Sequence, residues 1–294
     1  RRGGGGVRGL APPTPREGRA GGGDGEWDVV VDTWSAAPRA VRDTARLLAG
    51  RASRYVYVSS CSVYAWPRGV GCTEAGALVE GASADAEQTD YARDKHGGEL
   101  AVLDAFGAER SLLVRAGLIL GPHEDIGRLP WWLNRIARGG PVLAPGPRDL
   151  PLQYVDVRDL AEWVLAAVEG ELSGPYNLVS PSGHTTMEAL LDACVSATGA
   201  EAELRWTDPR EVLDAGIEPW VQLPVWFPPG DVHDGIHRLD VSRAVAAGLR
   251  CRDVSETVAD TWAWLRARGG DAPQRDDRPV VGLDPAVEAA VLAG

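Results

Sequence analysis

The chain has no long apolar run and no paired cysteines. Among its 294 residues, no hydrophobic stretch approaches the roughly 18 residues that a membrane span needs, and no signal-peptide core follows the N-terminal arginines. The cysteines form no CxxC pair and no dense framework, as is typical of proteins from a reducing compartment; they are Cys61, Cys72, Cys194 and Cys251. These absences predict a cytoplasmic protein that has no membrane among its partners.

Positive charge is also scarce. Lys and Arg number 30 against 42 Asp and Glu, which gives a formal net charge of −12 at pH 7. An acidic chain repels phosphate backbones, so nucleic acid is not expected as a partner. Hydrophobic residues make up 44% and charged residues 24%, the proportions of a folded globular protein with about two ordinary domains or one large α/β unit.

The first 26 residues contain few apolar side chains and many glycines and prolines. Such a segment cannot bury enough surface to offset its ordering entropy, so we expect residues 1–26 to be disordered. Gly3, Gly6 and Gly9 spell GxxGxxG, but no strand precedes them and no helix follows, so we interpret the match as a coincidence of composition. Because the chain begins at Arg1 and its only methionine is Met187, we also expect its natural start to be missing.

From Trp27 onward the pattern alternates between strand and helix. Continuous runs of β-branched residues are typical of strands covered on both faces of a parallel sheet. The segments predicted in this way are strands at 27–34, 54–60 and 111–120, and helices at 38–49 and 89–107. Asp156 and Asp159 are both expected to serve as caps or turn formers at the start of one helix, and Thr185 is expected to cap the next helix. The rhythm predicts a doubly wound α/β sheet, with a more irregular pattern from about residue 175.

The sharpest chemical pattern joins a strand end to the next helix. Ser59 and Ser60 end a strand, while Tyr91 and Lys95 lie one helical turn apart on one face of the following helix. A free phenol titrates near 10, and a neighbouring ammonium lowers that pKa towards a value useful for proton transfer. YxxxK alone is a weak signal, because an exposed Tyr and Lys on a solvated helix is common. Its position after the strand VSSCSVY favours a functional interpretation.

Several segments together resemble one enzyme family. YVYVSSCSVYAWP, YARDKHGGE, LLVRAGLILGP, LQYVDVRDLA and GPYNLVSP occur in the order seen in the extended short-chain dehydrogenase/reductase superfamily. The chain is most similar to its NAD-dependent epimerase/dehydratase family, over about residues 27–269. The resemblance implies a Rossmann-like NAD(P)-binding core at 27–174, with a parallel sheet truncated at its N-terminal strands. It also implies a smaller C-terminal α+β substrate lobe at 175–294.

The resemblance also assigns residues to roles. The implied catalytic residues are Ser60, Tyr91 and Lys95, and the implied NAD(P)-lining residues are Thr33, Trp34, Ser35, Ser59, Tyr91, Lys95 and Leu118. Many sugar-nucleotide members carry Asn where this chain has Leu118, which weakens a specific sugar-nucleotide assignment. The family begins with a strand, a glycine-rich turn and a helix that holds the pyrophosphate, and residues 1–26 are too few for these elements.

Two functions remain open at this stage. The first is an NAD- or NADP-dependent oxidoreductase or epimerase that acts on a hydroxyl or carbonyl of a small molecule, with a sugar nucleotide among the candidates and Tyr91 as proton shuttle. The second is a catalytically impaired, cofactor-poor relative that acts as a sensor or scaffold. The missing phosphate-binding turn favours the second function, and the intact Ser60, Tyr91 and Lys95 set favours the first.

Other features predict partners or exclude sites. An incompletely covered sheet edge beside the Trp27 strand invites association, so a homodimer is one expected assembly. His233 and His237 have helical spacing but no third ligand nearby, so no metal site is predicted. The segment 218–231 concentrates tryptophan and proline, and the sequence leaves open whether it is a pocket lid or part of the lobe core.

Overall fold

The computed structural model describes residues 25–86 and 90–293, and these fall into two compact units. The first unit contains the chain up to Tyr64, Ala77–Arg115 and Glu171–Pro175; the second contains Ala65–Gly76, Ala116–Gly170 and the chain from Tyr176. Each unit is therefore assembled from separate stretches, whereas the sequence-based division has one boundary, at 174/175, and stays a prediction. The expectations for residues 1–24, including the GxxGxxG match, lie outside the described residues.

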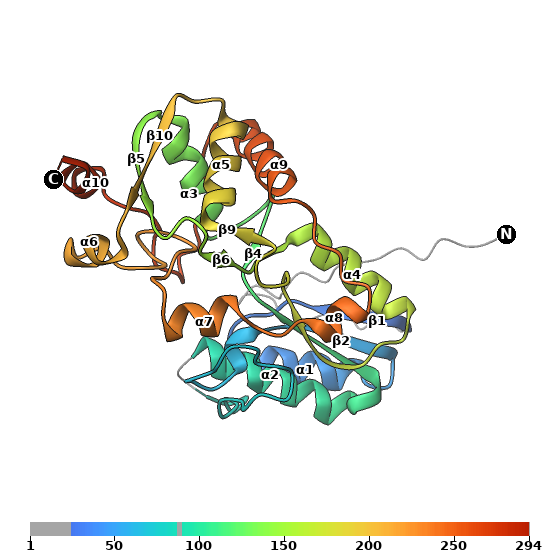
Figure 1. Ribbon diagram of the computed structural model, residues 1–294. Helices are drawn as coiled ribbons and strands as arrows, with labels where there is room; N and C mark the ends of the chain where they lie inside the picture. Colours follow the sequence, from blue (N-terminus) through green and yellow to red (C-terminus); the bar gives the residue numbers. More distant parts are fainter. Residues whose placement is uncertain (1–24, 87–89, 294) are drawn as a thin grey trace. The chain divides into compact units, whose positions relative to one another are not determined.

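A sheet of order β1-β2-β3-β8 organises the first unit (Figure 1). β1 (Trp27–Asp32) pairs in parallel with β2 (Ala52–Ser60), and helices α1 (Arg39–Leu48) and α2 (Tyr91–Phe106) pack against each other. The other elements are η1 (Cys61–Val63), η2 (Ala108–Arg110), β3 (Ser111–Ala116) and β8 (Gly174–Leu178), which begins in this unit. The alternation of strands and helices confirms the predicted α/β class.

Two glycines let α2 lie close to its neighbours. A Cβ on Gly98 would lie 2.5 Å from the hydroxyl oxygen of Tyr57, and one on Gly97 would lie 2.4 Å from the carbonyl oxygen of Ala82. The N-terminal half of α2 is therefore pressed against β2 and the connection before the helix, which fixes the residues at its first turns. Beneath it, Tyr57 and Val102 belong to the apolar core of this unit.

β1 is the outer strand of this sheet. Val31 is 47% exposed and Trp27 is 37% exposed, although both carry large apolar side chains. The sequence predicts an incompletely covered edge here, and these exposures confirm it for the described part of the chain. The association expected from that edge stays a prediction.

The second unit is built from short sheets and packed helices. β5 (Gly140–Pro145) pairs in parallel with β10 (Ala202–Thr207), and α5 (Met187–Thr198) packs against both α3 (Arg128–Ala137) and α9 (Val254–Ala267). The other strands are β4 (Ile119–Leu120), β6 (Pro151–Leu152), β7 (Val155–Asp156) and β9 (Thr185–Thr186). The other helices are α4 (Val157–Glu169), α6 (Pro209–Asp214), α7 (Asp231–His237), α8 (Ser242–Ala246) and α10 (Pro285–Ala293). No helix in the described part of the chain is both long and apolar enough to cross a membrane.

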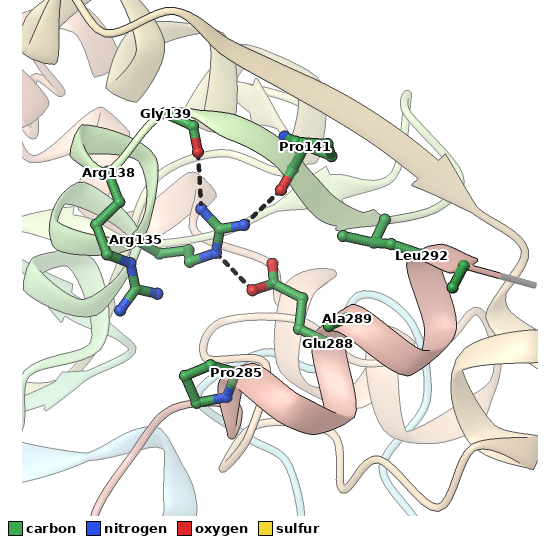
Figure 2. Close-up of a pocket in the computed structure, with 9 residues that line it drawn as sticks. Arg135, Arg138, Gly139, Pro141, Pro285, Glu288, Ala289 and Leu292 are labelled. Atoms are coloured by element: carbon green, nitrogen blue, oxygen red, sulfur yellow. Dashed lines mark hydrogen bonds and ion pairs between the residues drawn. The ribbon is translucent and has the colours of Figure 1, made fainter.

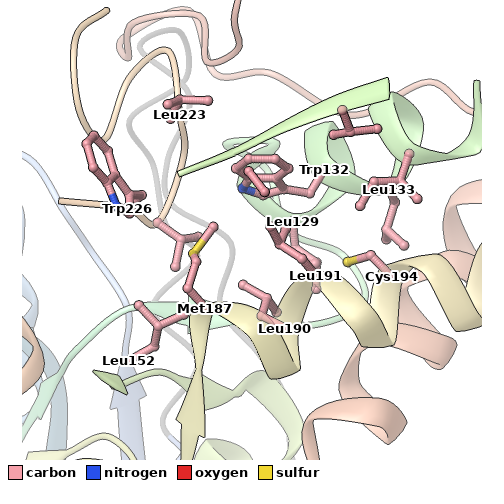
Figure 3. Packing of buried hydrophobic residues seen from close by; sticks show 14 of the residues in the cluster. Leu129, Trp132, Leu133, Leu152, Met187, Leu190, Leu191, Cys194, Leu223 and Trp226 are labelled. Carbon is pink, nitrogen blue, oxygen red and sulfur yellow. The ribbon is translucent and has the colours of Figure 1, made fainter. Parts of the chain in front are cut away.

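The segment 218–231 forms part of the core of this unit. Leu223 and Trp226 are fully buried and belong to the same cluster as Trp132 and Met187 (Figure 3). The indole nitrogen of Trp132 donates to the carbonyl of Pro224 at 2.8 Å, so the segment is held by a polar contact as well as by packing. Of the two interpretations that the sequence leaves open, lobe core is the one that this burial supports.

Of the two aspartates expected as caps, Asp156 is the cap of α4, because it accepts from the Arg158 N–H at 2.8 Å. Local details differ from the sequence-based expectation at two points. Thr186 rather than Thr185 caps α5, because its hydroxyl is the one that accepts from the Ala189 N–H, at 3.1 Å. The predicted strand 111–120 is broken at Gly117, whose Cα lies so close to Val179 that a Cβ would come within 2.7 Å.

A cavity of about 540 Å³ lies between the end of α3, the start of β5 and α10 (Figure 2). Arg135 donates from Nε to Glu288 at 2.6 Å and also bonds the carbonyl oxygens of Gly139 and Pro141. The other oxygen of Glu288 accepts from the Leu143 N–H at 3.1 Å. This ion pair fastens the C-terminal helix to the unit, and none of the predicted site residues lines the cavity.

Candidate functional site

The turn after β1 is held by a carboxylate. Asp32 accepts from the hydroxyl of Tyr55 at 2.6 Å and from the Trp34 N–H at 2.8 Å, and the indole N–H of Trp34 donates to Ala37 at 2.9 Å. Of the predicted cofactor-lining residues in this turn, Thr33 is exposed and Trp34 is half-buried. The predicted lining residue Ser35 is also half-buried. The turn is thus fixed at the carboxyl end of a parallel strand, where such sheets bind ligands.

Lys95 joins the ends of the first two strands. Its Nζ donates to the carbonyl oxygens of Trp34 and Val58 at 2.6 Å each, and it lies 4.8 Å from the centroid of the Tyr57 ring. The residue is 3% exposed, so a positive charge is buried at this edge of the sheet. It is also the only lysine in the chain, a signal in the composition that sequence reasoning missed.

The two serines at the end of β2 are held differently. Ser60 Oγ accepts from the Ser62 N–H at 3.1 Å and so caps η1. Ser59 Oγ is buried and has no hydrogen-bond partner among the described residues. A buried hydroxyl without a partner is uncommon in folded proteins, and a bound molecule would satisfy it.

Tyr91 is the first residue of α2. Asp90 caps the helix by accepting from the Arg93 N–H at 2.9 Å, which sets the direction in which the helix begins. Burial raises the pKa of Tyr57, and the negative charge of Asp32 raises it further. Tyr57 therefore stays protonated, and its hydroxyl donates to the Trp34 carbonyl at 3.1 Å.

The predicted catalytic residues lie on neighbouring elements of the first unit. Lys95 lies over the Tyr57 ring, Tyr91 begins α2 one helical turn before Lys95, and Ser60 follows Tyr57 three residues later on β2. Helix α2 packs against both β2 and η1. The predicted lining residue Leu118 belongs to the second unit, where it is buried and its carbonyl accepts from the Val155 N–H at 2.8 Å.

A buried ion pair behind this edge was not foreseen from the sequence. Arg115 of β3 donates from Nε and Nη2 to the two carboxylate oxygens of Glu99 of α2, at 2.9 and 2.8 Å. Glu99 follows Lys95 by one helical turn, so it lies on the same side of the helix. A Glu in a predicted helix and an Arg inside an apolar strand are the only traces of this pair in the sequence.

The two histidines of α7 have structural partners in the second unit. His237 Nδ1 accepts from the Gln153 N–H at 3.0 Å, its Nε2 lies 3.2 Å from the Val225 carbonyl, and His233 Nε2 lies 2.9 Å from the Pro151 carbonyl. Burial lowers the pKa of His237 to about 3, and the neighbouring His233 lowers it as well. His237 is therefore neutral in the folded protein at ordinary pH.

The depressed pKa of His237 predicts a loss of stability in acid. In the unfolded chain this histidine takes up a proton near pH 6.5, whereas the folded protein holds off protonation until about pH 3. The stability that this neutral histidine contributes is present above pH 6.5 and falls by about 1.4 kcal/mol per pH unit below it. In chemical denaturation between pH 6 and about pH 4, the free energy of unfolding of His237→Asn should fall less steeply with decreasing pH than that of the unsubstituted protein, by the slope of one proton. Equal slopes for the two proteins would contradict this prediction.

A protein-family model resembles more than half of this chain. The family model described as "NAD dependent epimerase/dehydratase family" matches residues 28–178, which is more than half of the chain. The chain belongs to this epimerase/dehydratase family. No curated protein matches it in sequence.

Solved structures show that this family member has the Rossmann-like fold predicted from its sequence. WbmH from Bordetella bronchiseptica, in complex with NAD+, superposes with a TM-score of 0.57 and 20% identity, covering 82% of this chain and 76% of that one. The UDP-N-acetylglucosamine 4-epimerase from Methanobrevibacter ruminantium, in complex with UDP-N-acetylmuramic acid, gives a TM-score of 0.57 and 14% identity, with 83% and 77% covered. A dTDP-4-dehydrorhamnose reductase from Clostridium acetobutylicum gives a TM-score of 0.56 and 14% identity, with 81% of each chain covered.

Proposed function

We propose that this chain is an NAD(P)-dependent enzyme that oxidises or reduces a hydroxyl or carbonyl carbon of a small molecule. The observation that carries the proposal is the buried cation of Lys95 at the carboxyl ends of β1 and β2, next to a buried serine hydroxyl that has no partner among the described residues. Membership of the epimerase/dehydratase family supports the same reaction class.

The residues at this edge fit the nicotinamide–ribose end of NAD(P). The Ser59 hydroxyl, which has no partner among the described residues, would bond a ribose hydroxyl, and the turn that contains Trp34 would line the site beside Lys95. The further candidates for lining the cofactor are Thr33, Ser35, Tyr91 and Leu118. Residues 25–86 and 90–293 contain no GxxGxxG turn between a strand and a helix, so this fit concerns the nicotinamide end alone.

The chain's own residues would carry the proton chemistry. Tyr91 would take the proton from a substrate hydroxyl, or return it to a carbonyl oxygen, through its phenol oxygen. Lys95, one helical turn away, places a positive charge where it stabilises the negative charge that forms on that oxygen. Ser60 would donate its hydroxyl hydrogen to the substrate oxygen, because its Oγ already accepts from the Ser62 N–H. When bound, NAD(P) supplies the hydride acceptor or donor.

The substrate proposed is a sugar nucleotide. Two structures of similar fold, the 4-epimerase from Methanobrevibacter ruminantium and WbmG from Bordetella bronchiseptica, contain UDP-N-acetylmuramic acid and UDP, respectively. Sequence identity to both is below 20%, so the molecules bound to them support a substrate class and no particular sugar. A homodimer is proposed on the exposed β1 edge alone.

A pair of serine variants tests cofactor binding. Ser59→Ala removes a buried hydroxyl that has no partner in the described part of the chain, so it should not lower the free energy of unfolding. It should nevertheless weaken NADH binding by about five-fold, the equivalent of one hydrogen bond. The matched control is Ser111→Ala, whose Oγ donates to Gly107 at 2.6 Å. It should destabilise the protein by about 1 kcal/mol and leave the affinity unchanged.

Binding is measured by energy transfer from tryptophan to NADH and NADPH, and by calorimetry with NAD+ and NADP+. Absence of binding to all four by the folded chain would contradict the enzyme proposal. The alternative, a cofactor-poor sensor or scaffold, is favoured by one observation, the lack of a GxxGxxG strand–turn–helix in the described residues. That alternative expects the folded protein to bind none of the four nucleotides.

A further inference from the structure

Glu99 and Arg115 form a closed ion pair inside the first unit. Glu99 is 1% exposed and Arg115 is 3% exposed, and two parallel hydrogen bonds join guanidinium to carboxylate. Burial lowers the pKa of Arg115, but the hydrogen bonds and charge of Glu99 outweigh this and raise it overall. Two-point contact between planar groups restrains both distance and orientation, which a single hydrogen bond cannot do.

The same arginine holds the turn that follows β2. Its Nη1 donates to the hydroxyl of Tyr64 at 3.1 Å, and its guanidinium lies 5.0 Å from the centroid of that ring. Its backbone carbonyl accepts from Cys61 Sγ at 3.0 Å. Cys61 is the first residue of η1 and Tyr64 is its C-terminal cap, while Ser60 is its N-terminal cap. Arg115 therefore contacts both ends of the turn that begins at Ser60.

The other partner of Arg115 lies on the helix of the proposed catalytic pair. Tyr91, Lys95 and Glu99 are spaced four residues apart on α2, so they lie one above another along one side of the helix. Fixing Glu99 from β3 fixes how far α2 extends over the sheet and how it is rotated. Both quantities determine where the first turns of the helix stand over β2.

We infer that Arg115 is a positioning residue. Through Glu99 it holds α2, which carries Tyr91 and Lys95, and through Tyr64 it holds the turn that begins at Ser60. It thereby sets the distance from the first turns of α2 to Ser60. The inference rests on the proposed function for its catalytic consequence only. Lysine at position 115 keeps the charge but cannot make the two-point contact, so it should let the helix and the turn move relative to each other. Displacements of about 1 Å can cost about 100-fold in rate.

The single lysine gives a direct readout of this geometry. In protein labelled with carbon-13 at lysine, one set of ε-methylene signals reports Lys95, whose Nζ lies over the Tyr57 ring, so the ring current of that tyrosine sets their shift. Arg115→Met, which adds no second lysine, should move these signals towards the values of free lysine. The matched control is Arg135→Met, which removes a guanidinium from the buried ion pair of the second unit and should leave them in place.

Activity provides the second readout. With NAD+ and a panel of UDP- and dTDP-sugars, Arg115→Lys and Tyr64→Phe should lower kcat by about 10- to 100-fold while KM for NAD+ changes by less than about three-fold. Unchanged lysine signals in a folded Arg115→Met protein would overturn the inference, as would normal kcat in both Arg115→Lys and Tyr64→Phe. The lysine signals are measured without cofactor. Absence of NAD(P) binding would therefore contradict the proposed function, while the lysine signals would still test whether Arg115 positions α2.

Discussion

Tyr91→Phe should lower turnover by about 100- to 10,000-fold while NADH binding stays within about three-fold of the unsubstituted protein. The substitution removes the oxygen that exchanges a proton with the substrate but keeps the ring that begins α2. Because the Asp90 cap and the Lys95 bonds to the carbonyls of Trp34 and Val58 do not involve this hydroxyl, the edge of the sheet should remain in place.

The measurement is initial rate with NAD+ and the panel of sugar nucleotides, together with nucleotide affinity by energy transfer. Tyr176→Phe is the matched control, since it removes one hydroxyl from a buried tyrosine of the second unit and should keep turnover within about two-fold. A Tyr91→Phe enzyme that keeps more than a third of the rate would show that Tyr91 is not the proton shuttle. If Tyr91→Phe lowers both the rate and the nucleotide affinity, Tyr91 acts mainly in nucleotide binding.

Glu288→Ala should be the most destabilising of the single changes considered, at about 3–5 kcal/mol in the free energy of unfolding. Arg135 is 8% exposed, and the change would leave its guanidinium without the carboxylate and the Leu143 N–H without its acceptor (Figure 2). An uncompensated buried charge costs far more than the pair contributes when intact, because both ions have already lost their water.

Chemical denaturation measures the effect, and a double variant separates its causes. Arg135→Met combined with Glu288→Leu removes both charges and keeps the volume, so it should recover most of the lost stability. If the double variant is as unstable as Glu288→Ala, the packing of α10 rather than the stranded charge accounts for the loss. If Glu288→Ala costs less than about 1 kcal/mol, the pair is not buried in solution as it is in this structure.

Much of the fold could be predicted because its signals are local. The β-branched run from Trp27 and the strand before Ser60 predict buried parallel strands, and both are found within two residues of the expected ends. The first helices were also placed well, since the apolar spacing that marks them is a property of neighbouring residues. Cap positions were less certain, because several polar residues compete at a helix start and only backbone geometry chooses between Thr185 and Thr186.

Features of the candidate site likewise fall into those that local sequence predicts and those that depend on tertiary packing. The sequence by itself determined the family, because the strand ending in Ser59 and Ser60 and the helix that carries Tyr91 and Lys95 belong to segments that can be recognised locally. Only the tertiary structure decided that the Ser59 hydroxyl has no partner among the described residues, that the Lys95 ammonium bridges Trp34 and Val58, and that Arg115 joins α2 to the turn after β2. Those contacts join residues far apart along the chain, and local spacing carries no information about which distant groups the packing of a sheet brings within hydrogen-bond distance.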